Sequence, residues 1–263
     1  MKTEILSVLP GDHPWQNTLI CYDCVSSTND LAKELAKNGA PEGTVLVAAE
    51  QTAGRGRMGR SFHAPAGQGL YFSLILRPNC PAQQLLHLTC AAGVAACNAV
   101  EDCCGSRPKI KWTNDLVMGT QKLGGILTEL SVNSKGIAEW AVIGIGINCL
   151  QTKFPQEIQP IATSILLCTE KTCSPAQLAG YLIQRLSTLN QTLISGKQEI
   201  MDTYRQDCMT VSRQVVLLRG DEKRYGTALD VDEDGGLVVR FTDGTIETVQ
   251  SGEISVRGLY GYI

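Results

Sequence analysis

The stretch IKWTNDLVMGTQKLGGILTELSVNSKGIAEWAVIGIGINC, residues 110–149, decides the fold class of this chain. Four runs within it have the apolar and β-branched composition of strands: 110–112, 115–118, 122–130 and 138–149. Short polar turns, among them 119–121 and 133–136, join these runs. Strands joined by such short turns pair antiparallel, because parallel neighbours need a longer crossover. The stretch therefore predicts a largely antiparallel sheet.

Helices and two more strands are predicted on either side of this stretch. Ser27 is a good helix N-cap with Asp30 three residues later, and the helix that it begins ends before Gly39. Residues 44–51 and 69–78 have the apolar runs of buried strands. Three further helices are predicted: 81–104, 175–194 and about 197–207. Together these elements predict an α+β fold with a mainly antiparallel sheet.

The sequence pattern changes after Val211. From there β-branched and polar residues alternate, and Gly-Asp, Asp-Gly-Gly and Asp-Gly turns interrupt them, which is typical of a small barrel of short strands. A length of 263 residues allows one or two domains. We predict two, residues 1–209 and residues 210–263.

Composition excludes several classes of protein. A hydrophobic fraction of 43% and a charged fraction of 19% are those of a folded globular chain. A net charge of -3 argues against a protein that coats nucleic acid, which needs a broad basic surface. Neither an apolar run long enough to cross a membrane nor a signal peptide is evident, so we expect a cytoplasmic protein that does not bind membranes.

The cysteines predict reduced thiols. There are 11, an odd number, at scattered spacings in a chain of ordinary size, which does not fit a disulfide framework. Cys21 and Cys24 have CxxC spacing, but no second CxxC or nearby histidine pair accompanies them. A redox or zinc site is therefore not predicted there.

The loop TAGRGRMGR, residues 52–60, places three arginines and three glycines within nine positions. Arginine offers forked donors that suit phosphate or carboxylate, and glycine lets backbone come close to a ligand. The loop lacks the residue order of a P-loop and does not match GxGxxG. Taken alone, it is either an anion-binding loop or an exposed basic turn, such as an RNA-contacting Arg-Gly segment.

Two further motifs carry candidate chemistry. In KWTNDL, residues 111–116, the Asn-Asp pair suits a plain hairpin turn, but Lys122 and a glycine pair at 124–125 follow closely. A cation, a carboxylate and a glycine gap so close together suit a reaction of a magnesium nucleotide. In GIGINC, residues 144–149, the glycines serve either a ligand or tight packing against a helix.

Together and in order, the motifs resemble the biotin protein ligase family from about residue 18 to residue 257. The motifs are SSTND, EQTAGRGRMGRSF, LYFSLILRP, IKWTNDL, KLGGILTEL, GIGIN and a closing GEISVR. The resemblance implies a catalytic domain like that of class II aminoacyl-tRNA synthetases, followed by an SH3-like small barrel. Only 25 residues precede Ser26, so we expect the monofunctional type, without the N-terminal DNA-binding domain of family members that repress transcription.

The resemblance implies an enzyme that uses ATP and Mg²⁺ to activate biotin as biotinyl-5′-AMP. It then transfers biotin to one lysine of a biotin carboxyl carrier protein, from acetyl-CoA carboxylase or another biotin-dependent carboxylase. The implied biotin-binding residues are Ser27, Thr28, Asn29, Gln51, Arg55, Gly56, Arg57 and Lys122. The implied residues for ATP and the adenylate are Arg57, Arg60, Phe62, Asn114, Asp115 and Asn148.

Three of these residues have implied catalytic roles: Lys122, Arg57 and Asp115. Lys122 is the expected cation at the biotin carboxylate, and Asp115 the expected Mg²⁺ ligand. Asp115 is favoured over His63 as the group that accepts a proton from, or orients, the attacking lysine amine. Phe62 is expected to wall or stack on the adenine. The contacts of loop 150–164 are not assigned.

Two alternatives stay open at this point. One is a lipoate- or octanoate-protein ligase of the same superfamily, which the GRGRMGR loop disfavours. The other is a non-enzymatic RNA- or protein-binding module, which leaves Lys122, Asn114 and Asp115 without a role. The sequence also leaves open whether the chain forms a homodimer and which carrier it recognises, although the small β-domain of a carrier could dock by sheet-edge pairing.

Overall fold

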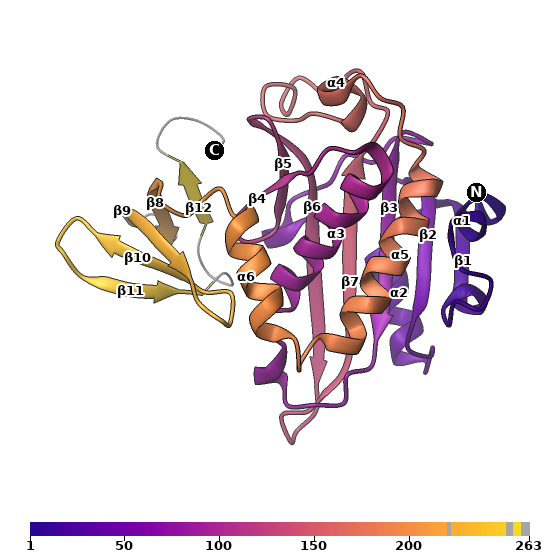
Figure 1. Ribbon diagram of the computed structural model, residues 1–263, viewed down its shortest axis with the longest axis horizontal. Coiled ribbons are helices and arrows are strands. Elements are labelled where there is room, and N and C mark those ends of the chain that lie inside the picture. Colours follow the sequence, from indigo (N-terminus) through magenta and orange to yellow (C-terminus); the bar gives the residue numbers. More distant parts are fainter. Residues whose placement is uncertain (220–221, 251–254, 259–263) are drawn as a thin grey trace.

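The computed structural model describes residues 1–219, 222–250 and 255–258. Within them the chain forms a seven-stranded and a five-stranded sheet. Figure 1 shows the smaller sheet beside the β4 edge of the larger one.

The larger sheet is mixed but mainly antiparallel. Its strands are β1 (Leu19–Val25), β2 (Thr44–Gln51), β3 (Gly69–Leu76), β4 (Lys109–Lys111), β5 (Asp115–Met118), β6 (Gln121–Val132) and β7 (Ala138–Asn148). Their order is β1-β2-β3-β7-β6-β5-β4, and only the β1–β2 pairing is parallel. The predicted fold class is confirmed. The parallel edge strand β1 was not predicted; the helix after it provides the crossover that a parallel pair needs.

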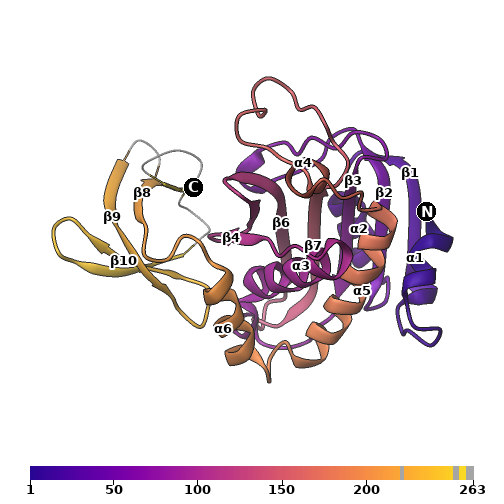
Figure 2. The same ribbon diagram turned by 45° about the horizontal axis from the view of Figure 1, so that its top comes forward.

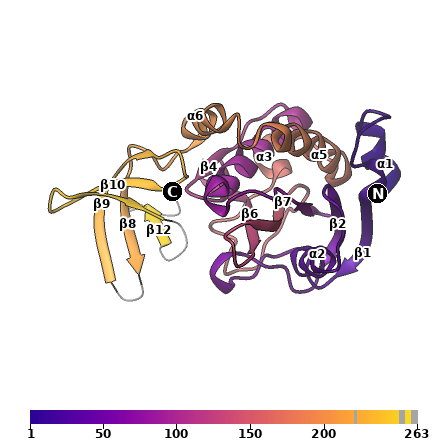
Figure 3. The same ribbon diagram turned by 90° about the horizontal axis from the view of Figure 1, so that it is seen from below.

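The helices lie on both faces of this sheet. They are α1 (Lys2–Val8), α2 (Thr28–Lys37), α3 (Leu88–Cys104), α4 (Ile165–Thr169), α5 (Pro175–Thr192) and α6 (Lys197–Asp207). Figure 3 shows α3, α5 and α6 on one side of the sheet and α2 on the other. Helices α1 and α4 were not predicted. The helix expected from Pro81 is wrong at its start, because a separate 3₁₀ turn, Ala82–Leu85, precedes α3.

Strand β3 shows how the two faces differ. All eight of its residues are buried, since helices cover both sides. Phe72 and Leu74 join the large core that includes the buried residues of α3 and α5, whereas Ile75 packs with Ala32 and Ala36 of α2. The face toward α2 also holds Ser73, a fully buried polar side chain.

The smaller sheet is antiparallel. Its strands are β8 (Gln214–Arg219), β9 (Glu222–Val231), β10 (Leu237–Phe241), β11 (Ile246–Val249) and β12 (Ser255–Gly258), in the order β11-β10-β9-β8-β12. Short antiparallel strands after α6 confirm the predicted small C-terminal β-domain. Residues 252–254 of the GEISVR motif lie outside the described residues.

All the cysteines are free thiols, and most of them are buried. Burial raises the pKa of Cys90 to about 12, which is the behaviour of an unreactive structural thiol. Among the described residues, no helix has both the length and the apolar character needed to cross a bilayer.

Candidate functional site

A cavity of about 570 Å³ collects side chains from α2, β2, the arginine loop and the strands β5, β6 and β7. The predicted residues that line it are Ser27, Thr28, Asn29, Gln51, Arg55, Gly56, Arg57, Arg60, Phe62, Asn114, Asp115 and Lys122. Asn148 and His63 are not among the lining residues. The fold thus brings together three sequence motifs that lie up to 95 positions apart, from Ser27 to Lys122.

One end of the cavity is a hydrogen-bonded polar wall at the start of α2. Ser27 caps the helix, because its side chain accepts a hydrogen bond from the backbone of Asp30. Thr28 donates from its backbone N and its Oγ1 to Oε1 of Gln51, at 2.8 and 3.0 Å. Ser73 Oγ lies 2.8 Å from Oγ1 of Thr28. These bonds hold the hydroxyl and amide groups in fixed orientations.

Asn29 is held by the sheet below it. Its Nδ2 donates to the carbonyl of Leu127 at 3.2 Å and to Oε2 of Glu129 at 3.1 Å, and its Oδ1 accepts from Ser73 at 2.7 Å. A methyl group at Gly144 would overlap the Asn29 carboxamide. Gly144 therefore makes room for a polar side chain of α2, which agrees with the packing interpretation of GIGINC.

Gly146 does the same for an aromatic ring. A Cβ at this position would lie 2.7 Å from Cε1 of Phe62. Phe62 also meets Tyr71 edge to face, with ring centroids 6.3 Å apart. The two glycines of β7 thus seat Asn29 and Phe62, both of which line the cavity.

A charged centre lies toward the β4–β5 edge of the sheet. Lys122, near the start of β6, places Nζ 2.5 Å from Oδ1 of Asp115 at the start of β5. Both side chains are only partly exposed, at 32% and 20%. Next to them, Nη1 of Arg57 donates to Oδ1 of Asn114 at 2.8 Å. Burial lowers the pKa of Arg57, with the Asp115 carboxylate acting in the opposite direction, but an arginine stays charged at neutral pH.

The two adjacent glycines of β6 have different roles. Gly124 lies against the backbone carbonyl of Gly146 on the neighbouring strand. Gly125 lines the cavity, and a Cβ added to it would lie 3.5 Å from Nζ of Lys122. Close ligand approach is therefore available at Gly125, and Gly124 serves strand packing.

The arginine loop is a self-bonded turn. Gly56 N donates to the carbonyl of Arg60 at 2.7 Å, and Arg60 N donates to the carbonyl of Arg57 at 3.2 Å. Gly59 takes a φ of +72°, a left-handed conformation that favours glycine. Side chains tie the turn to the body of the protein, through Arg57 and through Arg55, whose Nη1 lies 2.5 Å from Oδ1 of Asp30.

Asn148 and His63 lie apart from this arrangement. The buried carboxamide of Asn148 donates to the carbonyl of Thr163 at 2.9 Å and accepts from Gln151 at 3.2 Å. Its observed contacts thus hold loop 150–164. His63 is exposed on the loop that follows Phe62.

Several lining residues were not predicted. Loop 150–164, which extends past the end of the sheet in Figure 2, reaches the cavity through Ile161. It is fastened to β6, because Lys122 N donates to the carbonyl of Ile161 at 2.7 Å and Thr163 N donates to the carbonyl of Lys122 at 2.9 Å. Lys111 and Trp112 also line the cavity. Their place in the KWTNDL motif was the signal that could have identified them.

Two family models and several known proteins match this chain. Residues 21–148 match the biotin/lipoate A/B protein ligase family, and residues 213–257 match the biotin protein ligase C-terminal domain. The bifunctional ligase/repressor BirA of Bacillus subtilis is 36% identical over 97% of this chain and 76% of its own length. The biotin–acetyl-CoA-carboxylase ligase of Mycobacterium tuberculosis is 29% identical over 91% of this chain and 89% of its own.

A solved structure is similar as well. It is the biotin protein ligase from Aquifex aeolicus in complex with biotin and ATP, with a TM-score of 0.78 and 31% sequence identity. The match covers 91% of this chain and 98% of that one.

Proposed function

From the premise that this chain belongs to the biotin protein ligase family, we propose that it activates biotin with ATP and transfers it to a carrier-protein lysine. The intermediate is biotinyl-5′-AMP, and the acceptor is a biotin carboxyl carrier protein. One observation carries the proposal: a single cavity holds a neutral polar wall at one end and the Lys122–Asp115 pair with the arginine loop at the other. Residues 1–209 form the catalytic domain in this proposal, and residues 210–263 the C-terminal domain.

The polar wall suits the biotin ring. A ureido ring presents fixed donors and acceptors, which oriented hydroxyl and amide groups recognise better than charges do. Support comes from the bonds that orient Thr28 and Gln51 within the cavity. Ser27 serves as helix cap beside them, and Asn29 shapes the wall.

The charged centre suits activation of the carboxylate. The biotin carboxylate attacks the α-phosphorus of ATP and pyrophosphate leaves, so one anion must approach another. Lys122 supplies a positive charge for the carboxylate, and Arg57 and Arg60 supply charge for the phosphates. Phe62 forms an apolar wall for the adenine. Asn148 contributes by holding loop 150–164 beside Lys122.

Mg²⁺ fits the same end of the cavity. It is usually held by one or two carboxylates together with substrate phosphates, and among the described residues no group of three or more His, Cys, Asp or Glu side chains could hold a metal by itself. Asp115 offers a carboxylate oxygen and Asn114 an amide oxygen at the cavity. When bound, the ion would neutralise charge on the triphosphate.

Transfer requires the carrier lysine to lose a proton, since a free lysine has a pKa near 10.4. Asp115 is the proposed acceptor or orienting group, because it lines the cavity and His63 does not. Closure of the arginine loop keeps water from the mixed anhydride until the carrier docks.

A test of this function is ATP–pyrophosphate exchange with the purified chain. We expect exchange to depend on biotin, and a purified carrier domain to gain the mass of one biotinyl group when biotin and ATP are both present. Exchange supported by lipoate and not by biotin would instead identify a lipoate ligase. Salt-sensitive RNA binding without any exchange would identify a non-enzymatic module.

Gly144→Ala should weaken biotin use selectively. The added methyl group displaces the Asn29 carboxamide, which disturbs the polar wall and leaves the charged centre intact. We expect the KM for biotin to rise by about tenfold, since a displaced polar wall leaves buried groups unpaired, while the KM for ATP stays within about twofold. An unchanged KM for biotin would show that the position of Asn29 does not matter for biotin.

A further inference from the structure

The end of α6 and the residues after it run along β4 and residues 112–113. Tyr204 OH donates to the carbonyl of Thr113 at 3.0 Å. Met209 N donates to the carbonyl of Ile110 at 2.9 Å, and Trp112 N donates to Oγ1 of Thr210 at 2.9 Å. Residues 204–210 therefore hold residues 110–113 from one side. These two segments are about 100 positions apart in the chain, yet they share backbone and side-chain hydrogen bonds.

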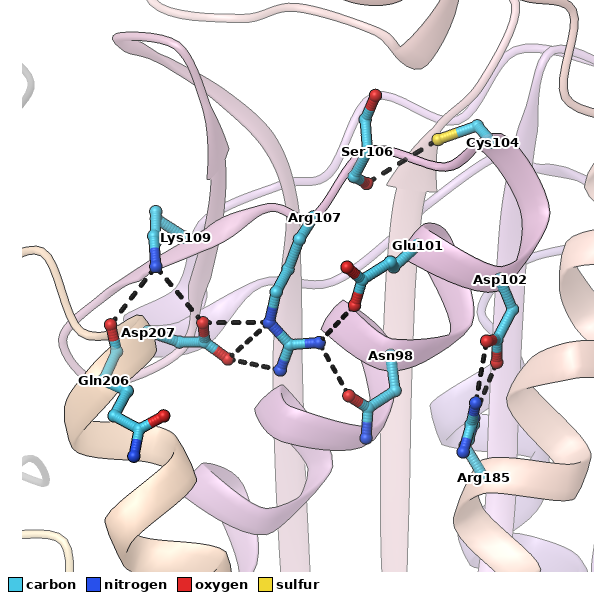
Figure 4. Close-up of polar contacts among 10 residues, drawn as sticks. All are labelled: Asn98, Glu101, Asp102, Cys104, Ser106, Arg107, Lys109, Arg185, Gln206 and Asp207. Atoms are coloured by element: carbon cyan, nitrogen blue, oxygen red, sulfur yellow. Dashed lines mark hydrogen bonds and ion pairs between the residues drawn. The ribbon is translucent and has the colours of Figure 1, made fainter.

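An ion pair closes the outer end of this contact (Figure 4). Arg107 donates from Nε to Oδ1 of Asp207 at 3.0 Å and from Nη2 to Oδ2 at 2.5 Å. The Asp207 side chain is only 4% exposed. Nη1 of Arg107 also reaches Oδ1 of Asn98 and Oε2 of Glu101 on α3, each at 2.7 Å.

The same carboxylate reaches β4 itself. Lys109 Nζ lies 3.4 Å from Oδ1 of Asp207 and donates to the carbonyl of Gln206 at 3.2 Å. The Arg107–Asp207 pair thus joins the ends of α3 and α6 at the point where β4 begins. A forked guanidinium–carboxylate pair of this kind fixes orientation as well as distance.

Strand β4 leads directly into the cavity. Lys111 and Trp112 line it, and Asn114 and Asp115 follow in the chain. In the sheet order β1-β2-β3-β7-β6-β5-β4, β4 and β5 lie at one edge, and β2, the strand that carries Gln51, lies next to the other. The Arg107–Asp207 pair therefore lies on the side of the sheet that carries the charged centre, away from the strand that carries Gln51.

We propose that Arg107 and Asp207 are positioning residues for the nucleotide. Their ion pair holds β4 in place, and β4 places Lys111, Trp112 and the residues after them against the bound nucleotide. The inference rests on the proposed function, because that function assigns Asn114, Asp115 and the arginine loop at the charged end to ATP and Mg²⁺. It adds that the end of α6 keeps the nucleotide end of the cavity in position.

The test compares Asp207→Asn with a control in a second forked pair, Arg185→Gln. Arg185 donates to Asp102 of α3 at 2.6 and 2.7 Å, but this pair is more exposed than Arg107–Asp207, and it joins α3 to α5 without touching β4 (Figure 4). We expect Asp207→Asn to raise the KM for ATP in biotin-dependent pyrophosphate exchange by about tenfold, because small misplacements at a reacting site are costly. The KM for biotin should stay within about twofold, and Arg185→Gln should change neither value.

Arg107→Lys is the second variant, because it keeps the charge but loses the fork. We expect Arg107→Gln to raise the KM for ATP, and Arg107→Lys to raise it less. This pair of variants replaces Asp207→Asn as the test if Asp207→Asn does not fold. The proposal would be overturned if Asp207→Asn changed the KM for ATP and the KM for biotin equally. It would also be overturned if Arg185→Gln, at the same thermal stability, raised the KM for ATP as much as Asp207→Asn does. Absence of biotin-dependent exchange in the unaltered chain would instead refute the proposed function, so the two failures are distinguishable.

Discussion

Lys122→Met should lower biotin-dependent pyrophosphate exchange by about 10²–10³-fold, the typical loss when one charge-stabilising group is removed from an active site. Methionine keeps much of the length of the side chain but removes the cation that we propose offsets repulsion between the biotin carboxylate and ATP. In the structure the Lys122 ammonium is already held in the cavity by Asp115, at 2.5 Å. The rate of adenylate formation in a single turnover measures the effect directly.

A matched control for Lys122→Met is Lys197→Met. Lys197 pairs with Asp234 at the same distance of 2.5 Å and has similar exposure, 27% against 32% for Lys122, but it does not line the cavity. We expect the control to leave exchange within about twofold of the unaltered chain, as a partly exposed ion pair contributes little to stability. A Lys122→Met variant with full exchange activity would remove Lys122 from the reaction.

Arg57→Gly should convert a selective ligase into one that releases its intermediate. Arg57 links the arginine loop to Asn114 through a 2.8 Å hydrogen bond and faces the charged centre. Without it the loop loses that link and, in the proposed function, a charge-assisted bond to the adenylate phosphate. Such a bond contributes about 1.5–3 kcal/mol, and each 1.4 kcal/mol is about tenfold in affinity, so retention of biotinyl-5′-AMP should fall by roughly 10–100-fold.

Labelling of a bystander protein checks this expectation. With biotin and ATP, the Arg57→Gly variant should biotinylate surface lysines of an unrelated protein such as albumin, and the unaltered chain should modify only the carrier. Omission of ATP should abolish both reactions, which shows that the reactive species is the adenylate. Labelling confined to the carrier by the variant would exclude Arg57 from retention of the intermediate.

Local sequence patterns were sufficient for much of this protein. The antiparallel hairpins of residues 110–149, the Ser27 cap of α2 and the small C-terminal β-domain follow from apolar periodicity, turn chemistry and capping, which act between near neighbours. Half of the residues that line the cavity were among the predicted site residues, since they lie in short motifs typical of the family. The helix expected from Pro81 shows the limit of such patterns: its composition is helical, yet α3 starts at Leu88.

The remaining features depend on contacts between distant segments. Ser73 and Glu129 orient Asn29 from two other strands, Gly144 and Gly146 make room for Asn29 and Phe62, and β1 pairs in parallel with β2. No local pattern marks these relationships, because they arise from strand order and from which face of the sheet a side chain occupies.

The sequence by itself determined the type of most helices and strands and the family, and it predicted the chemical groups of the site. Only the tertiary structure decided which of those groups share one cavity. It placed Lys122 and Asp115 together across a strand pairing, directed Asn148 to loop 150–164, and joined Arg107 to Asp207 across 100 positions. The physical reason is that a side chain acquires its partners from packing and strand order, whereas its sequence neighbours determine only its local conformation.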